Sequence, residues 1–109
     1  MKRGEMIYSE KFYWGPSMLI LSRDRIGMIR EPKQWRIQYP VSVKLIFNTA
    51  SRHDLDKYIR GALDFLKERE VIIDDNWVDN VEATKKYVKS DFEDFTIEVY
   101  QWVKEEGEQ

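Results

Sequence analysis

The sequence of 109 residues contains no cysteine and only one histidine, His53. The absence of cysteine excludes disulfides, zinc–thiolate sites and thiol nucleophiles. A Ser-His-Asp triad would have to be built around His53, and no G-x-S-x-G motif accompanies it. The five glycines are scattered and form no phosphate-cradling loop, so we expect no nucleotide cofactor.

Long apolar runs are also missing. The longest stretch, MLIL at residues 18–21, is far too short to cross a bilayer. The first residues, MKRGEMIYSEKF, lack the apolar run of a signal peptide. We therefore expect a cytoplasmic protein that makes no membrane contact.

Hydrophobic residues make up 42% of the chain and aromatic residues 14%, which favours a folded protein over a disordered one. The length predicts a single domain over residues 1–109, with an acidic tail at 104–109. Residues 1–60 carry 12 Lys and Arg against 6 Asp and Glu, and residues 61–109 carry 6 against 14. Such an uneven distribution of charge is typical of a protein in which one part contacts phosphates. It also occurs in small domains that bind no phosphates.

Hydrophobic periodicity predicts an α+β fold with a mixed sheet and one main amphipathic helix. Residues 41–48 alternate between apolar and polar, which is the pattern of a half-buried strand. From Asp54 the apolar spacing becomes i, i+3, i+4, which predicts a helix over about residues 54–68 with Asp54 as its N-cap. Further strands are expected at 71–73, 81–87 and 95–102, with a turn at 89–91.

The first forty residues are less regular. We expect residues 18–21 and 26–29 to form a hairpin. Residues 31–39 fit either a short helix or an irregular connection to the strand at 41–48.

The second half of the first forty residues contains a stretch that is rich in basic residues and also carries aromatic side chains. It contains Arg23, Arg25 and Arg36, and the basic residues Arg52 and His53 follow the strand at 41–48. Together these side chains could form a track for nucleic-acid phosphates. The alternative is an ordinary solvated hairpin.

Four carboxylates bracket the predicted helix, with Asp54 and Asp56 at its start and Asp74 and Asp75 after the apolar run at 71–73. Carboxylates gathered in one place repel each other unless a cation binds between them. Mg²⁺ prefers a few carboxylates and keeps several waters, and it can activate water for attack on a phosphodiester. The alternative is a solvated helix start followed by an acidic turn.

Arg60 stands four residues after Asp56 and so shares its face of the helix. The two could form a helix-stabilising ion pair worth about 0.3–0.5 kcal/mol. Arg60 could also be a fixed cation that stabilises charge on a phosphate under attack. The two roles are compatible.

The run DLDKYIRGALDFLKEREVIIDD, residues 54–75, resembles the signature of the RusA-like Holliday junction resolvases. That family shows D-x-D-N, a basic residue four positions after the second Asp, D-A-L one turn further on, and an apolar run that ends in D-D. The matching positions here are Asp54, Asp56, Arg60, Asp64, Asp74 and Asp75. The chain departs from the pattern at Lys57, where the family has Asn, and at Arg60, where the family commonly has Lys.

The resemblance implies a Mg²⁺-dependent endodeoxyribonuclease, with Mn²⁺ as a substitute, in DNA recombination and repair. It also implies a homodimer that nicks four-way DNA junctions symmetrically, which suits the two-fold symmetry of such a junction. Two alternatives remain open from the residues. One is a junction-binding protein of the same fold with weak or lost cleavage, and the other is a small non-enzymatic domain.

The same resemblance implies a role for each matching residue. The implied metal ligands are Asp54, Asp56 and Asp75, which with Arg60 are also the implied catalytic residues. Asp64 and Asp74 would support these ligands. The residues expected to contact DNA are Arg52, His53, Lys57, Arg23, Arg25 and Arg36.

Overall fold

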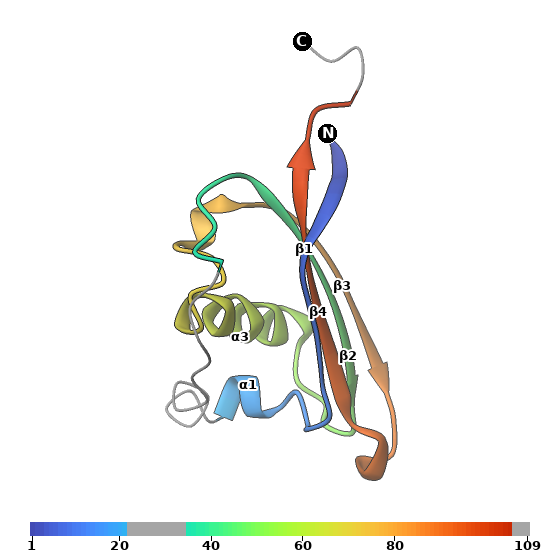
Figure 1. Cartoon of the computed structure of the whole chain (residues 1–109). Coiled ribbons are helices and arrows are strands. Elements are labelled where there is room, and N and C mark those ends of the chain that lie inside the picture. The colour runs from blue at the N-terminus through green and yellow to red at the C-terminus, as the bar shows by residue number, and fades with distance from the viewer. Residues whose placement is uncertain (22–34, 106–109) are drawn as a thin grey trace.

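Four strands form one mixed sheet, and one long helix covers one of its faces (Figure 1). The computed structural model describes residues 1–21 and 35–105. The order across the sheet is β1 (Lys2–Phe12), β4 (Asp94–Val103), β2 (Val41–Thr49) and β3 (Val78–Tyr87). β2 is parallel to β3 and antiparallel to β4, and β1 is antiparallel to β4. The predicted α+β class with a mixed sheet and one main helix is confirmed.

The main helix, α3 (Leu55–Glu68), matches the predicted range closely and packs its apolar stripe on the sheet. Tyr58, Ala62, Phe65 and Leu66 are buried in this contact. Asp54 occupies the predicted N-cap position, but its side chain makes no capping hydrogen bond. The Asp54 side chain is exposed instead.

The core lies between α3 and the two central strands. Three cross-strand pairs, Val43–Val99, Leu45–Ile97 and Phe47–Phe95, are fully buried because alternate residues of β2 and β4 face the helix. The predicted strands at 41–48, 81–87 and 95–102 are confirmed as β2, β3 and β4. The predicted turn at 89–91 is confirmed as η2 (Ser90–Phe92), a short 3-10 helix between β3 and β4.

β1 is an edge strand that the periodicity of the sequence does not reveal. Its buried apolar residues, Tyr8 and Phe12, are separated on the core face by Glu10. Glu10 is accommodated there because its carboxylate lies 3.2 Å from the guanidinium of the buried Arg69. The register also shifts between Arg3 and Tyr8, which breaks the period of two further.

Residues 18–21 are helical, so the predicted strand of a hairpin is wrong there. They form α1 (Met18–Leu21), in which Met18 N donates to the Gly15 carbonyl at 3.0 Å and Leu19 N to the Pro16 carbonyl at 3.0 Å. A four-residue apolar run suits a buried helix as well as a strand, so its period cannot distinguish the two. The second half of the predicted hairpin, residues 26–29, lies outside the described residues, as do Arg23 and Arg25.

Residues 71–73 do not form the predicted strand. Only Ile72 makes a β-bridge, parallel to Ile37, and Ile37 N donates to the Val71 carbonyl at 2.9 Å. Val71 and Ile72 are buried against the segment before β2, so their apolar side chains pack without joining the sheet. The described part of residues 31–39 is an irregular connection, in which Arg36 has a left-handed φ of 42°.

Gly61 allows α1 to approach α3 closely. A Cβ atom at Gly61 would lie 2.7 Å from the Leu19 carbonyl oxygen and 2.8 Å from the Leu19 Cβ. Alanine is the better helix former by about 1 kcal/mol. We nevertheless expect Gly61→Ala to lower the free energy of unfolding by about 1–3 kcal/mol, because the helices must move apart.

Chemical denaturation measures this effect. Glu68→Ala on the exposed face of α3 is the control and should change the free energy of unfolding by less than about 0.5 kcal/mol. A Gly61→Ala variant that is more stable than the wild type would contradict the close helix contact.

Within residues 1–21 and 35–105, no helix combines the length and the apolar character needed to span a membrane.

Candidate functional site

The parallel strands β2 and β3 end at the same edge of the sheet, where Thr49 is paired with Tyr87, and the loop after β2 turns back from that edge to the start of α3 (Figure 1). The loop after β2 carries Arg52, His53 and Asp54, three of the predicted site residues. In sheets with parallel strands, ligands bind beyond the carboxyl ends of the strands. This edge is therefore the candidate site.

Glu93 links the loop after β2 to the connection between β3 and β4 through a hydrogen bond. It lies in the connection from β3 to β4, which must cross the end of β2 because β2 lies between those strands in the sheet. Ala50 N donates to a Glu93 carboxylate oxygen at 3.1 Å, and Val88 N donates to the Thr49 carbonyl at 3.0 Å. These bonds hold the loop after β2 and the connection after β3 in fixed positions.

Asp54 and Asp56 are both exposed at the start of α3. A carboxylate oxygen of Asp56 lies 3.3 Å from the guanidinium of Arg60, and both side chains are mostly exposed, at 63% and 75%. The predicted i, i+4 ion pair is confirmed. Because the pair faces solvent, its contribution to stability is small, and the carboxylate keeps lone pairs for a further ligand.

Asp74 and Asp75 lie toward the other end of α3. A carboxylate oxygen of Asp75 is 3.7 Å from the Lys67 ammonium, which is also 3.8 Å from Asp64. Lys67 follows Asp56 by eleven residues. At a rise of 1.5 Å per residue this corresponds to roughly 16 Å along the helix.

The three predicted metal ligands are therefore not brought together within one chain. Asp54 and Asp56 flank the first turn of α3, whereas Asp75 is held near its last turns. No group of three or more Asp, Glu or His side chains in the described ranges is placed to hold a metal ion. The cause is the straight helix between the two acid pairs, which keeps them apart.

The Asp74 carboxylate caps η1 (Asp75–Trp77), the 3-10 helix before β3. It accepts a hydrogen bond from Asn76 N at 3.2 Å. That bond, followed by a contact from the Asp75 side chain and the charge of Lys67, lowers the pKa of Asp74 below its ordinary value. The stabilisation is present above the unfolded pKa of the carboxyl group and is lost as the pH falls through the lowered value.

Basic and aromatic side chains from the end of β3 surround the loop that carries Arg52 and His53. Lys85 Nζ donates to the His53 carbonyl at 2.7 Å, and the Arg52 guanidinium lies 4.5 Å from the ring centroid of Tyr87. We call this region the strand-end surface, and it consists of Arg52, Lys85, Lys86, Tyr87, Lys89 and Phe92. The sequence analysis missed all of these except Arg52. The run KKYVK at the end of a predicted strand is the signal that would have identified most of them.

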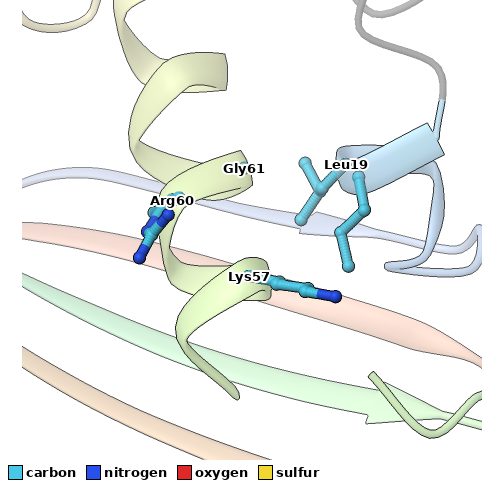
Figure 2. Close-up of a pocket in the computed structure, with 5 residues that line it drawn as sticks. Leu19, Lys57, Arg60 and Gly61 are labelled. Atoms are coloured by element: carbon cyan, nitrogen blue, oxygen red, sulfur yellow. The ribbon is translucent and has the colours of Figure 1, made fainter. Parts of the chain in front are cut away.

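A pocket of about 180 Å³ opens between α1 and α3 near the start of α3. Its lining residues are Leu19, Ile20, Lys57, Arg60 and Gly61. Figure 2 shows Lys57 extending from the first turn of α3 beneath the side chains of α1. Two cationic side chains at one pocket favour an anion such as a phosphate oxygen.

Arg36 does not lie at the strand-end surface. Its backbone N–H donates to the Glu70 carbonyl at 3.0 Å, which places it beside the segment that joins α3 to β3. It therefore shares the end of the molecule that carries Asp74 and Asp75. A DNA contact by Arg36 would be separate from contacts at the start of α3.

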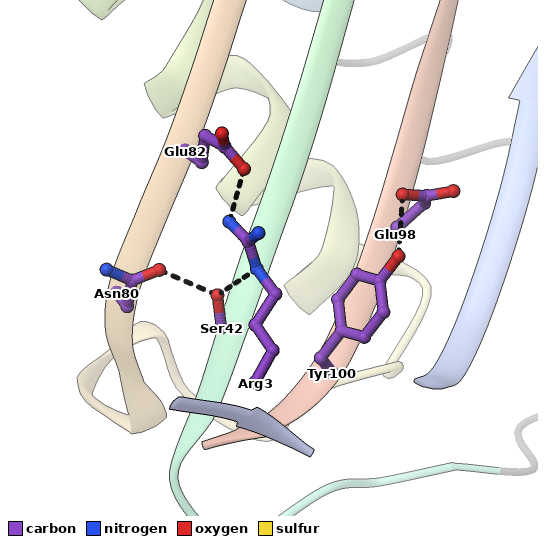
Figure 3. A network of polar contacts seen from close by, with 6 residues as sticks. All are labelled: Arg3, Ser42, Asn80, Glu82, Glu98 and Tyr100. Atoms are coloured by element: carbon purple, nitrogen blue, oxygen red, sulfur yellow. Dashed lines mark hydrogen bonds and ion pairs between the residues drawn. The ribbon is translucent and has the colours of Figure 1, made fainter. Parts of the chain in front are cut away.

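The face of the sheet opposite α3 carries a polar network (Figure 3). Arg3 Nε donates to Ser42 Oγ at 3.0 Å, and the Arg3 guanidinium pairs with Glu82. The Tyr100 hydroxyl donates to Glu98 at 2.9 Å, and this bond raises the pKa of Tyr100. Arg3, Ser42 and Glu82 come from β1, β2 and β3, so their contacts hold these strands together, whereas the bond between Tyr100 and Glu98 lies within β4.

Comparison with family models and with curated proteins finds no match to this chain. The likeness to the RusA-like resolvases therefore rests on the spacing of the acids in residues 54–75. Support for a function has to come from the side chains gathered around the start of α3.

Proposed function

We propose that this chain is a divalent-metal-dependent endodeoxyribonuclease that acts on branched DNA as a homodimer, in the manner of the RusA-like resolvases that it resembles. The observation that carries the proposal is the location of Asp54 and Asp56. Both are exposed beside a basic surface that includes Arg52 and Lys85. A carboxylate pair within a basic surface suits a place where a cation and a phosphodiester meet.

The donor set of Asp54 and Asp56 fits Mg²⁺, which proteins typically hold through one or two carboxylates, with waters and substrate phosphate oxygens as the other ligands. Carboxylate oxygens also suit Mn²⁺. When bound, the metal would supply an activated water and neutralise charge on the phosphodiester.

Arg60 positions one carboxylate and retains donors for the substrate. Its guanidinium has five N–H groups, of which the contact with Asp56 uses only part. The others are available to a phosphate oxygen, and a planar guanidinium binds phosphate in a bidentate manner. Lys57, which makes no ion pair within the described part of the chain, would contact the same or the next phosphate.

A second chain would complete the acid set. The exposed face of α3 carries alternating charges at Asp56, Arg60, Asp64 and Lys67. Two such helices, antiparallel about a two-fold axis, would place Asp56 opposite Lys67 of the partner subunit and Arg60 opposite Asp64 of the partner subunit. Because Asp75 contacts Lys67 within a chain, this pairing would also bring Asp75 of the partner subunit toward Asp56.

A junction-binding protein with weak or lost cleavage is the second candidate. The observation that favours it is the contact between Asp75 and Lys67, which leaves one chain with only two carboxylates at the start of α3. The basic strand-end surface would serve such a protein equally well. The two candidates therefore differ in cleavage and agree in binding.

The experiment that separates them is a nicking assay on an end-labelled four-way junction, with linear duplex of the same sequence as the control. A nuclease gives paired nicks on the junction in Mg²⁺ or Mn²⁺ and none in EDTA. Tight binding without nicks in either metal would favour the binding protein. A chain that neither binds nor nicks the junction would contradict both candidates.

A further inference from the structure

The most exposed large apolar side chains gather at one edge of the sheet. Among the residues that the structure describes, the three most exposed are Tyr13 at 80%, Phe92 at 68% and Tyr87 at 62%. Tyr13 follows β1, Tyr87 ends β3, and Phe92 precedes β4, so all three lie at the edge where β2 ends. Large rings left exposed at one end of the sheet indicate a surface that binds a ligand.

Cations accompany these rings. The Arg52 guanidinium lies 4.5 Å from the centroid of Tyr87, and Lys11 Nζ lies 5.5 Å from the centroid of Tyr13. Lys86 and Lys89, on either side of Tyr87 in the sequence, are both exposed. Alternating rings and cations form the kind of surface on which bases stack while their phosphates are neutralised.

The acidic residues of the same connection do not cancel this positive charge. Asp94 lies 3.6 Å from the Lys11 ammonium, which balances its charge. Glu93 and Asp91 are outnumbered by the cations Arg52, Lys85, Lys86 and Lys89. Asp91 is the one acid of residues 85–92. The strand-end surface therefore carries an excess of cations, which favours a polyanion over a neutral or basic protein partner.

The rings favour unpaired bases over duplex. Lysine and arginine alone are sufficient to bind the phosphates of a duplex, whose bases are already stacked on one another. An exposed Tyr or Phe gains a partner only when a base is free of its neighbours, and stacking is then tolerant of sequence.

We propose that the strand-end surface binds single-stranded DNA by stacking unpaired bases on Tyr87 and Phe92. This inference rests on the proposed function for its identification of DNA as the ligand. It narrows the substrate to DNA in which unpaired bases lie beside the duplex that approaches Asp54 and Asp56.

The test is fluorescence anisotropy with a labelled single-stranded oligonucleotide in EDTA, so that neither metal nor cleavage is involved. Tyr87→Ala and Phe92→Ala should each weaken binding roughly 5–100-fold, the range expected for loss of one base stack. Tyr87→Phe should bind like the wild type, because the ring is retained. Tyr39→Ala is the matched control, since Tyr39 is also an exposed tyrosine but precedes the opposite end of β2.

Binding to linear duplex is measured in parallel. Each ring substitution should weaken the affinity for duplex by less than about twofold, because phosphate contacts dominate duplex binding. Unchanged single-strand binding in both alanine variants would overturn the proposal. Equal weakening for single strand and duplex would also overturn it. If the rings control single-strand binding but the nicking assay is negative, the stacking surface stands and the nuclease proposal fails.

Discussion

Mixing two inactive chains, one carrying Asp56→Asn and the other Asp75→Asn, is expected to restore metal-dependent cleavage of a four-way junction. Under the proposed pairing of Asp56 of one protomer with Asp75 of the partner subunit, each mixed dimer has one acid set with both substitutions and one intact acid set. If half of the dimers are mixed, about a quarter of the sites are intact. The cleavage rate of each variant alone should fall more than about 100-fold. Loss of a residue that merely supports a metal ligand already lowers metal affinity or activity by about 10–100-fold.

The matched control for this experiment mixes Asp56→Asn with Asp54→Asn. Asp54 and Asp56 of one protomer contribute to the same acid set. Each of the two acid sets in a mixed dimer therefore lacks one carboxylate and stays defective. Co-expression of the two chains and recovery of the mixed dimer through two different tags give the sample for the nicking assay. Failure of the first mixture to recover, or recovery of the control mixture, would contradict an acid set shared between subunits.

Phe95→Ala is expected to lower the free energy of unfolding by about 3–5 kcal/mol. Phe95 is fully buried in β4, and its ring centroid lies 4.6 Å from those of Phe12 and Trp14. The substitution would leave a cavity between the sheet and α3 that the surrounding rings cannot fill. Because a domain of this size is stable by only about 5–15 kcal/mol, the loss should be visible as a large shift of the urea midpoint.

Phe92→Ala provides the control for the same chemical change. Phe92 lies three residues before Phe95 but is 68% exposed, so its removal should alter the free energy of unfolding by less than about 0.5 kcal/mol. Equal losses in the two variants, or no loss for Phe95→Ala, would contradict the position of the core.

β2 and α3, each of which buries one regular face in the core, could be predicted from the sequence, whereas β1 could not. β2 and α3 show clean periods because every second strand residue, and the stripe with Tyr58 and Phe65, meets the same core. β1 is hidden because Glu10 takes a core-facing position that only the distant Arg69 makes acceptable. Such compensation between residues far apart in the sequence leaves no local signal.

Some features of the candidate site could likewise be predicted from the sequence, and others could not. The pair of Asp56 and Arg60 is set by helix geometry and could be predicted from spacing alone. The separation of Asp75 from Asp56 depends on the length of α3, which the apolar spacing predicts, and on the path into β3, which it does not. Lys85 comes close to His53 because β2 and β3 are parallel neighbours, and that pairing is known only from the structure.

The measurement that tests the central claim most directly compares binding and nicking of the same four-way junction by the wild type and Asp56→Asn. Asp79→Asn is the control, because Asp79 is an exposed aspartate near the start of β3, at the opposite end of that strand from the strand-end surface. The account predicts that Asp56→Asn binds the junction equally or more tightly, since a repulsive charge near phosphate is removed, and nicks it more than about 100-fold more slowly in Mg²⁺. Nicking by Asp56→Asn at the rate of the wild type and of Asp79→Asn would contradict it.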